Sequence, residues 1–84
     1  MIHELKCWPE YFKEVKKGNK TFEVRKNDRN YRRRDILHLN EYDPELKTFT
    51  GDKVYTSVNY VLYGGAFGIQ DGYVVMSIRL IKPI

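Results

Sequence analysis

The residues best suited to chemistry are a lysine, a glutamate and an arginine in the run Gly18–Arg25, which reads GNKTFEVR. Glu23 and Arg25 are two positions apart, so in a strand their side chains share a face, and Lys20 stands at the strand's entrance. Two cations around one carboxylate keep it ionised and leave spare N–H donors for a phosphate or a base edge. The three residues fit a ligand site, and they also fit an internal ion pair that fixes the strand.

A second candidate is the segment Arg29–Arg34, where Tyr31 stands among four arginines. Arginine offers both a fork of donors for phosphate and a flat face that stacks on bases. Residues 13–34 carry a net charge of +7, whereas the other 62 residues carry −3. This asymmetry favours a polyanionic partner, although a solvated, mobile loop accounts for it as well. Contacts to RNA are predicted from Arg32, Arg33 and Arg34.

Four of the six glycines lie in the stretch Gly64–Gly72, together with Phe67. Backbone N–H groups in such a loop can approach a ligand, and the Phe67 ring can stack on a base. The stretch lacks the Gly-Lys-Ser/Thr ending of a P-loop and opens no obvious helix. A flexible connection between two strands is the simpler interpretation.

The rest of the composition excludes several classes of protein. Cys7 is the only cysteine, so an internal disulfide and a secreted, disulfide-stapled scaffold are excluded. With only His3 and His38 beside it, a closed zinc site is not expected, and we predict no metal and no cofactor. The first residues lack the apolar core of a signal peptide, and no apolar stretch reaches membrane-spanning length. We therefore predict one cytoplasmic domain, residues 1–84, with no membrane partner.

The hydrophobic pattern predicts one short helix and about five or six short strands, a mainly β (α+β) domain. The helix, Trp8–Lys17, opens at Pro9 and ends at the capping residue Gly18. Its apolar stripe includes Trp8, Phe12 and Val15, which fall at helical spacing. Strands are predicted at Ile2–Lys6, Thr21–Lys26, Asp35–Tyr42, Lys47–Thr50, Val54–Leu62 and Tyr73–Ile81, with turns at Asp43-Pro44 and Gly51-Asp52.

Alternation within the strands predicts which side chains are buried. In the second strand Phe22 and Val24 share one face, and Glu23 and Arg25 lie on the other. In the longest run, one face carries Val54, Thr56, Val58, Tyr60 and Leu62. We expect a small closed barrel with the helix packed against one opening. Its largely buried residues are predicted to include Trp8, Phe12, Val24, Leu37, Val58, Leu62, Met76 and Ile78.

The run Gly18–Arg25 resembles the ASCH signature, G-x-K-x-x-E-x-R, of a division of the PUA-like superfold. The preceding helix and the following strands occur in the expected order, so the resemblance covers nearly the whole chain. It is closest to small stand-alone bacterial and phage proteins of unassigned function. It implies a small PUA-like β-barrel that binds RNA or a nucleotide. The chain departs from the pattern at Arg34, where a glycine commonly precedes the aspartate that corresponds to Asp35, so the turn is expected to differ in shape.

Three functions remain open on the sequence. The first is binding of RNA or a nucleotide in a basic, partly aromatic cleft around the G-x-K-x-x-E-x-R motif. The second is a small protein-interaction or regulatory module, which the small size and the seven tyrosines permit. The predicted ligand-binding residues are Lys20, Glu23, Arg25, Arg32, Arg33, Arg34, Trp8, Tyr31 and Phe67.

The third function is that of an amidohydrolase acting on a modified nucleoside such as acetylated cytidine, which one ASCH branch resembles. Lys20 matches the catalytic lysine of that branch. Glu23 stands where the threonine nucleophile belongs, and no glutamate follows Glu45 to supply the distal carboxylate. A nucleophile needs a base within hydrogen-bond reach, so the sequence favours a protein that is not an enzyme.

Overall fold

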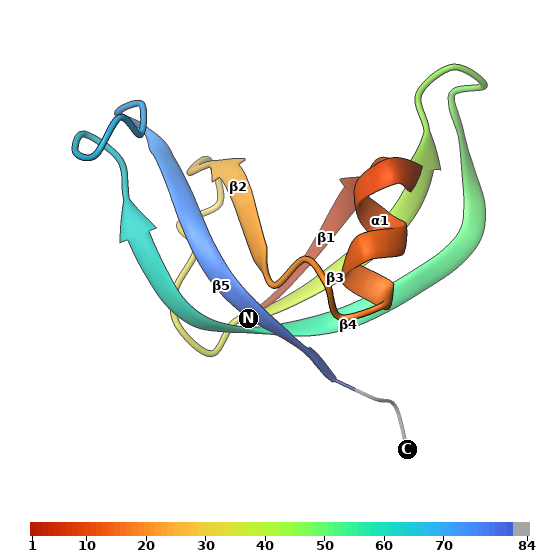
Figure 1. Cartoon of the computed structure of the whole chain (residues 1–84), viewed down its shortest axis with the longest axis horizontal. Coiled ribbons are helices and arrows are strands. Elements are labelled where there is room, and N and C mark those ends of the chain that lie inside the picture. The colour runs from red at the N-terminus through yellow and green to blue at the C-terminus, as the bar shows by residue number, and fades with distance from the viewer. Residues whose placement is uncertain (82–84) are drawn as a thin grey trace.

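The computed structural model describes residues 1–81. Its five strands form one sheet in the order β1-β3-β4-β5-β2. The sheet is strongly curled into a half-barrel, with the helix inside the curve and the edge strands β1 and β2 turned toward each other (Figure 1). The mainly β prediction is therefore confirmed, but the expected closed barrel is wrong, because the edge strands β1 and β2 are not paired with each other. The elements are β1 (Ile2–Cys7), α1 (Pro9–Lys16), β2 (Phe22–Lys26), β3 (Ile36–Asp43), β4 (Thr48–Tyr63) and β5 (Tyr73–Ile81).

The strand pairing explains how the chain places β1 and β2 at the two edges of the sheet. β1 pairs with β3 in parallel, from Ile2 opposite Ile36 to Cys7 opposite Glu41. The other three pairs are antiparallel. A parallel pair needs a crossover connection, and here α1, β2 and the loop after β2 supply it. The crossover therefore carries the G-x-K-x-x-E-x-R run from one edge of the sheet to the other.

The two strands predicted at Lys47–Thr50 and Val54–Leu62 are one long strand, β4. The turn predicted at Gly51-Asp52 was wrong, because these residues lie inside the strand. The register between β3 and β4 shifts here, and Gly51 has a φ of +93°. A glycine in this left-handed region accommodates an irregularity without ending the strand.

A bulge in β4 also overturns the predicted alternation. Val58 lies opposite Ile78 and Tyr60 opposite Ser77, so one extra residue stands between them on β4. An extra residue moves every later side chain to the other face. Beyond the bulge Val61 is buried, whereas Tyr60 is 58% exposed and Leu62 is only half-buried.

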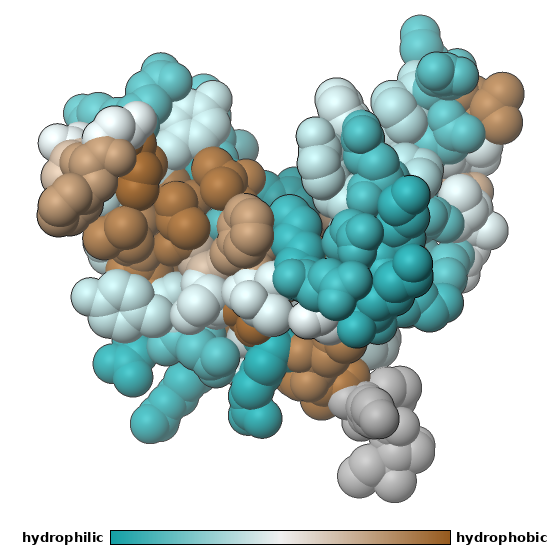
Figure 2. Space-filling model, in the orientation of Figure 1, coloured by the Kyte–Doolittle hydropathy of each residue, from teal (hydrophilic) through white to brown (hydrophobic). Residues whose placement is uncertain are grey.

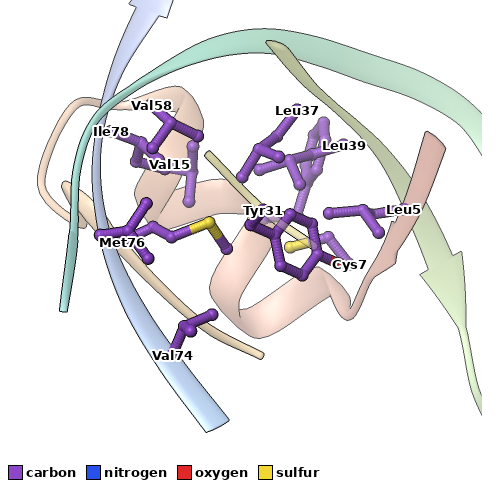
Figure 3. Packing of buried hydrophobic residues seen from close by; sticks show 12 residues of the cluster. Leu5, Cys7, Val15, Tyr31, Leu37, Leu39, Val58, Val74, Met76 and Ile78 are labelled. Atoms are coloured by element: carbon purple, nitrogen blue, oxygen red, sulfur yellow. The ribbon is translucent and has the colours of Figure 1, made fainter. Parts of the chain in front are cut away.

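The core fills the concave side of the curled sheet, where α1 contributes Phe12 and Val15 (Figure 3). Of the predicted core, Phe12, Leu37, Val58, Met76 and Ile78 are buried as expected. Trp8 and Val24 were predicted wrongly, since they are 50% and 54% exposed. The cluster consists of Leu5, Cys7, Phe12, Val15, Tyr31, Leu37, Leu39, Val58, Val61, Val74, Met76 and Ile78.

Asp35 is a buried carboxylate just before β3. It accepts hydrogen bonds from His3 Nε2 at 2.8 Å and from the Arg32 backbone N–H at 3.0 Å. Burial raises the pKa of the Asp35 carboxyl, but the hydrogen bonds from His3, the Arg32 backbone and the Met1 α-amino group outweigh burial and lower it below its usual 3.8. At pH values above the unfolded-state pKa of Asp35, the ionised carboxylate therefore stabilises the fold. This contribution is lost as the pH falls through the lowered pKa of the folded state.

We accordingly expect Asp35→Asn to destabilise the protein at neutral pH. The difference from the wild type should shrink as the pH is lowered past 3.8, because the wild-type carboxylate then becomes protonated. Urea unfolding at stepped pH measures this difference. A difference that stays constant throughout the acidic range would contradict the assigned role of Asp35.

Candidate ligand-binding pocket

A pocket of about 500 Å³ opens where the end of β1, the start of α1 and β2 meet. The space-filling view shows the surface notched between the part that carries β2 and the part that carries α1 (Figure 2). The G-x-K-x-x-E-x-R run supplies more of this pocket than any other segment. The lining residues are Lys6, Cys7, Trp8, Tyr11, Lys20, Phe22, Glu23, Val24 and Arg25.

The faces of β2 are the reverse of those that side-chain hydropathy predicts. Glu23 is only 3% exposed, whereas Phe22 and Val24 are 47% and 54% exposed. β2 is an edge strand that pairs only with β5, and its inward face meets the end of β1 across the pocket. Burial of a carboxylate is costly unless it is paired and hydrogen-bonded. Two cations from the same run meet that requirement here.

The cations hold both oxygens of Glu23. Lys20 Nζ donates to Glu23 Oε1 at 2.7 Å and to the Phe22 carbonyl at 2.7 Å. Arg25 Nε donates to Glu23 Oε2 at 2.9 Å. Such charge-assisted bonds are roughly twice as strong as neutral ones. The carboxylate therefore fixes the positions of both cationic side chains.

Arg25 also joins the two edges of the sheet. Its Nη2 donates to the Lys6 carbonyl at 2.8 Å, which links β2 to β1 although the two strands are not paired. An unpaired carbonyl on an edge strand needs a partner, and the guanidinium supplies one. The Arg25 side chain therefore both lines the pocket and connects the two edge strands of the half-barrel.

Aromatic rings form the walls of the pocket. The Trp8 and Tyr11 rings stack with their centroids 6.4 Å apart. On the strand side, Lys20 Nζ lies 4.8 Å from the centroid of the Phe22 ring, within the range of a cation–π interaction. All three rings are about half-exposed. Their free faces are therefore available to a flat ligand.

Cys7 lines the pocket without being a nucleophile. Burial raises the pKa of its thiol to about 11, and the nearby Glu23 carboxylate adds to that rise. The thiolate is the reactive form of cysteine, and at neutral pH this thiol stays protonated. Cys7 therefore contributes a small apolar surface with a weak S–H donor.

The pocket unites four of the predicted site residues and adds others. Lys20, Glu23, Arg25 and Trp8 all line it. The prediction missed Tyr11, although its spacing of three from Trp8 places the two rings on one side of a helix. Lys6, Cys7, Phe22 and Val24 were also missed, because their contribution depends on β1 and β2 meeting across the half-barrel.

Two predicted stacking rings lie elsewhere. Tyr31 is 1% exposed and belongs to the core, where its ring packs edge-to-face with that of His3, the ring centroids lying 4.8 Å apart. Phe67 is 89% exposed in the loop between β4 and β5. Hydrogen bonds from Gly64 N–H to the Tyr73 carbonyl and from Gly65 N–H to the Ile69 carbonyl organise that loop. Neither ring lines the pocket.

The three consecutive arginines lie near the opposite end of β1. Only Asp35 separates them from β3, whose first residue Ile36 pairs with Ile2, whereas the pocket residue Cys7 pairs with Glu41. Five residues of strand, roughly 17 Å, separate these two levels. Arg33 Nε donates to the Asn59 carbonyl at 3.1 Å. Arg32, Arg33 and Arg34 are exposed and do not line the pocket.

Among residues 1–81, no helix has the length and apolar character needed to cross a membrane. In the same range, no group of three or more histidine, cysteine, aspartate or glutamate side chains is arranged to hold a metal ion.

Comparison with known proteins places the chain in a family. Residues 2–78 match the family described as "Domain of unknown function (DUF3850)". The chain is also similar to a protein of Escherichia phage P2 described as "Uncharacterized 12.9 kDa protein in GpA 3'region", with 45% identity over 60 residues. The match covers 71% of this chain and 53% of the phage protein, so it spans about half the length of that relative. Because the family match extends over nearly the whole sequence, the chain belongs to the DUF3850 domain family.

Proposed function

We propose that this domain binds single-stranded RNA by taking one nucleotide unit into the pocket between α1 and β2. The observation that carries the proposal is the combination of half-exposed aromatic rings with two cations fixed by a buried carboxylate. Single-stranded RNA is recognised by stacking bases on aromatic rings and by hydrogen bonds to base edges. The pocket supplies both kinds of contact in one place.

The size and lining of the pocket support a small, flat ligand. A volume of about 500 Å³ falls within the usual range of about 300–1,000 Å³ for small-molecule sites. Such sites are mostly apolar with a few well-placed polar groups. Here Trp8, Tyr11 and Phe22 provide the apolar surface, and Lys20 and Arg25 provide the polar groups.

The ASCH resemblance remains part of the proposal. Its signature residues Lys20, Glu23 and Arg25 face one pocket, as expected if the motif forms a binding site. Arg34 has a φ of +73°, a left-handed conformation that glycine adopts without strain. This supports the resemblance at the one position where the sequence departs from it, because ASCH sequences commonly have a glycine there.

The arginine run is proposed to contact the phosphates of a longer RNA. Arg32, Arg33 and Arg34 do not line the pocket, and roughly 17 Å of β1 separates their level from that of Cys7. We expect a longer RNA to contact both the pocket and the arginines, and a mononucleotide to contact the pocket alone. Their substitution is therefore expected to affect the binding of oligonucleotides and to leave the binding of mononucleotides unchanged.

The test is titration of a fluorescent single-stranded oligoribonucleotide at stepped salt concentrations. Replacing Arg32, Arg33 and Arg34 with glutamine should weaken binding and flatten the salt slope by about 0.7 per lost phosphate contact. A variant with Lys47, Lys53 and Arg79 replaced by glutamine loses the same charge away from the pocket and serves as the control. Wild-type affinity that does not change with salt would count against RNA binding.

The amidohydrolase alternative has less support. Lys20 lies in the pocket, but its Nζ already bonds the Glu23 carboxylate and the Phe22 carbonyl. Thr21, the nearest hydroxyl nucleophile in the sequence, is exposed and lines a separate cavity of about 210 Å³. The residues around the larger pocket therefore favour binding over hydrolysis.

A protein partner is a second candidate because of one exposed apolar face. Phe22, Ser77 and Tyr60 are neighbours across β2, β5 and β4, as are Val24, Val75 and Leu62. Phe22, Val24 and Tyr60 are each about half-exposed. Contiguous apolar surface of this kind marks many interaction sites. Light scattering of wild type and Val24→Lys tests self-association through this face.

A further inference from the structure

The polar side chains at the base of the pocket have more donors than they use. Lys20 Nζ has three N–H groups, of which Glu23 and the Phe22 carbonyl take two. Arg25 has five, of which Glu23 and the Lys6 carbonyl take two. Within residues 1–81 the remaining N–H groups of both side chains have no hydrogen-bond partner. They are free to meet a ligand.

Acceptors are much scarcer in the pocket. Both oxygens of Glu23 already accept a charge-assisted bond, and the Glu23 side chain is only 4% exposed. Lys20 and Arg25, which are 18% and 24% exposed, therefore cover it from the ligand's side. The Trp8 indole N–H and the Cys7 thiol act as donors, and the Tyr11 hydroxyl can act either way. With Lys6 also present, the lining carries three cations and one anion.

We propose that the pocket selects the keto purine edge of guanine, with its N7 and O6 acceptors. The proposal rests on the RNA-binding function given above and names the base that the pocket takes. A guanidinium or ammonium group pairs with N7 and O6, which is the commonest specific contact to guanine. Arg25 offers the two N–H groups of Nη1, and Lys20 offers its third N–H. The Trp8, Tyr11 and Phe22 rings supply the stacking surface.

Adenine and cytosine fit this site poorly. Adenine presents an amino donor beside N7, and cytosine presents an amino donor at the equivalent edge. Either would direct an N–H group at cations that are already held in place by Glu23. A polar site rejects an analogue that leaves its groups unpaired. Discrimination should therefore be at least about fivefold, which corresponds to the lower end of the range for a bidentate contact.

The experiment compares mononucleotides by calorimetry and by quenching of Trp8, the single tryptophan. The probes are GMP, IMP, AMP, 7-deaza-GMP and ribose 5-phosphate. GMP and IMP share the N7/O6 edge and should bind alike. AMP and 7-deaza-GMP should bind at least about fivefold more weakly, and ribose 5-phosphate should bind weakest. Arg25→Lys keeps the charge but loses the Nη1 donors, so it should reduce the preference for GMP over AMP.

The outcomes separate this inference from the function on which it rests. Equal affinities for GMP, AMP and ribose 5-phosphate would mean that the cations hold the phosphate, which overturns guanine selection and leaves RNA binding in place. A preference for AMP would overturn it as well. If neither the mononucleotides nor the oligoribonucleotide binds, both proposals fail. A circular-dichroism melt of Arg25→Lys checks that its fold is retained.

Discussion

Replacing Tyr31 with alanine should lower the free energy of unfolding by about 3–5 kcal/mol, as expected for loss of a buried aromatic ring. Tyr31 is 1% exposed, and its ring meets His3 edge-on with centroids 4.8 Å apart. Its backbone N–H also bonds Asn27 Oδ1 at 3.1 Å, which orders the loop that delivers the ring to the core. The total stability of a small domain is only about 5–15 kcal/mol, so this loss is large.

Phe67→Ala is the matched control, since the sequence predicted both rings to stack on RNA. Phe67 is 89% exposed, and its truncation should change stability by less than about 0.5 kcal/mol. Urea unfolding of both variants measures the contrast. Tyr31→Phe keeps the ring and should remain close to wild type, so a readable variant exists even if Tyr31→Ala fails to fold. Equal, small effects at Tyr31 and Phe67 would contradict the core position of Tyr31.

Replacing Glu23 with glutamine should lower both stability and affinity for RNA. The amide keeps the shape and one acceptor but turns a donor toward one of the two cations. Loss of hydrogen bonds to charged groups costs about 1.5–3 kcal/mol. The cost stays below the roughly 3–5 kcal/mol of a fully buried pair, because Lys20 and Arg25 are 18% and 24% exposed and can regain water.

The binding effect follows from the same contacts. Without the carboxylate, the Lys20 and Arg25 side chains lose the partner that positions their free donors. Asp52 forms an exposed ion pair with Lys16, in which Lys16 Nζ lies 2.6 Å from Asp52 Oδ2. Asp52→Asn makes the same chemical change in this pair, and it should leave the melting temperature and the affinity unchanged. The measurements are an unfolding curve and a titration corrected to the folded fraction. Reduced stability with unchanged affinity per folded molecule would make Glu23 purely structural.

Local features of the sequence determined the elements of this fold. Pro9 at the helix start and Gly18 after its end bracket α1, which runs from Pro9 to Lys16 within the predicted range. Period-two alternation located β2 and β5, and Cys7, as the only cysteine, excluded an internal disulfide. The spacing of Lys20, Glu23 and Arg25 also identified the residues that meet in the pocket. Caps and periodicity act over a few residues, so they are readable without the partner strands.

Only the tertiary structure decided which faces and which distant residues form the site. Hydropathy assigned Val24 inward, but the curl of the sheet brings the polar face of β2 against β1, where Lys20 and Arg25 neutralise Glu23. One extra residue after Val58 reversed the faces of β4. Parallel pairing of β1 with β3 separates the arginine run from the pocket, and the loop before β3 inserts Tyr31 into the core. Burial of a side chain depends on what covers it, and here the covering elements come from distant parts of the chain.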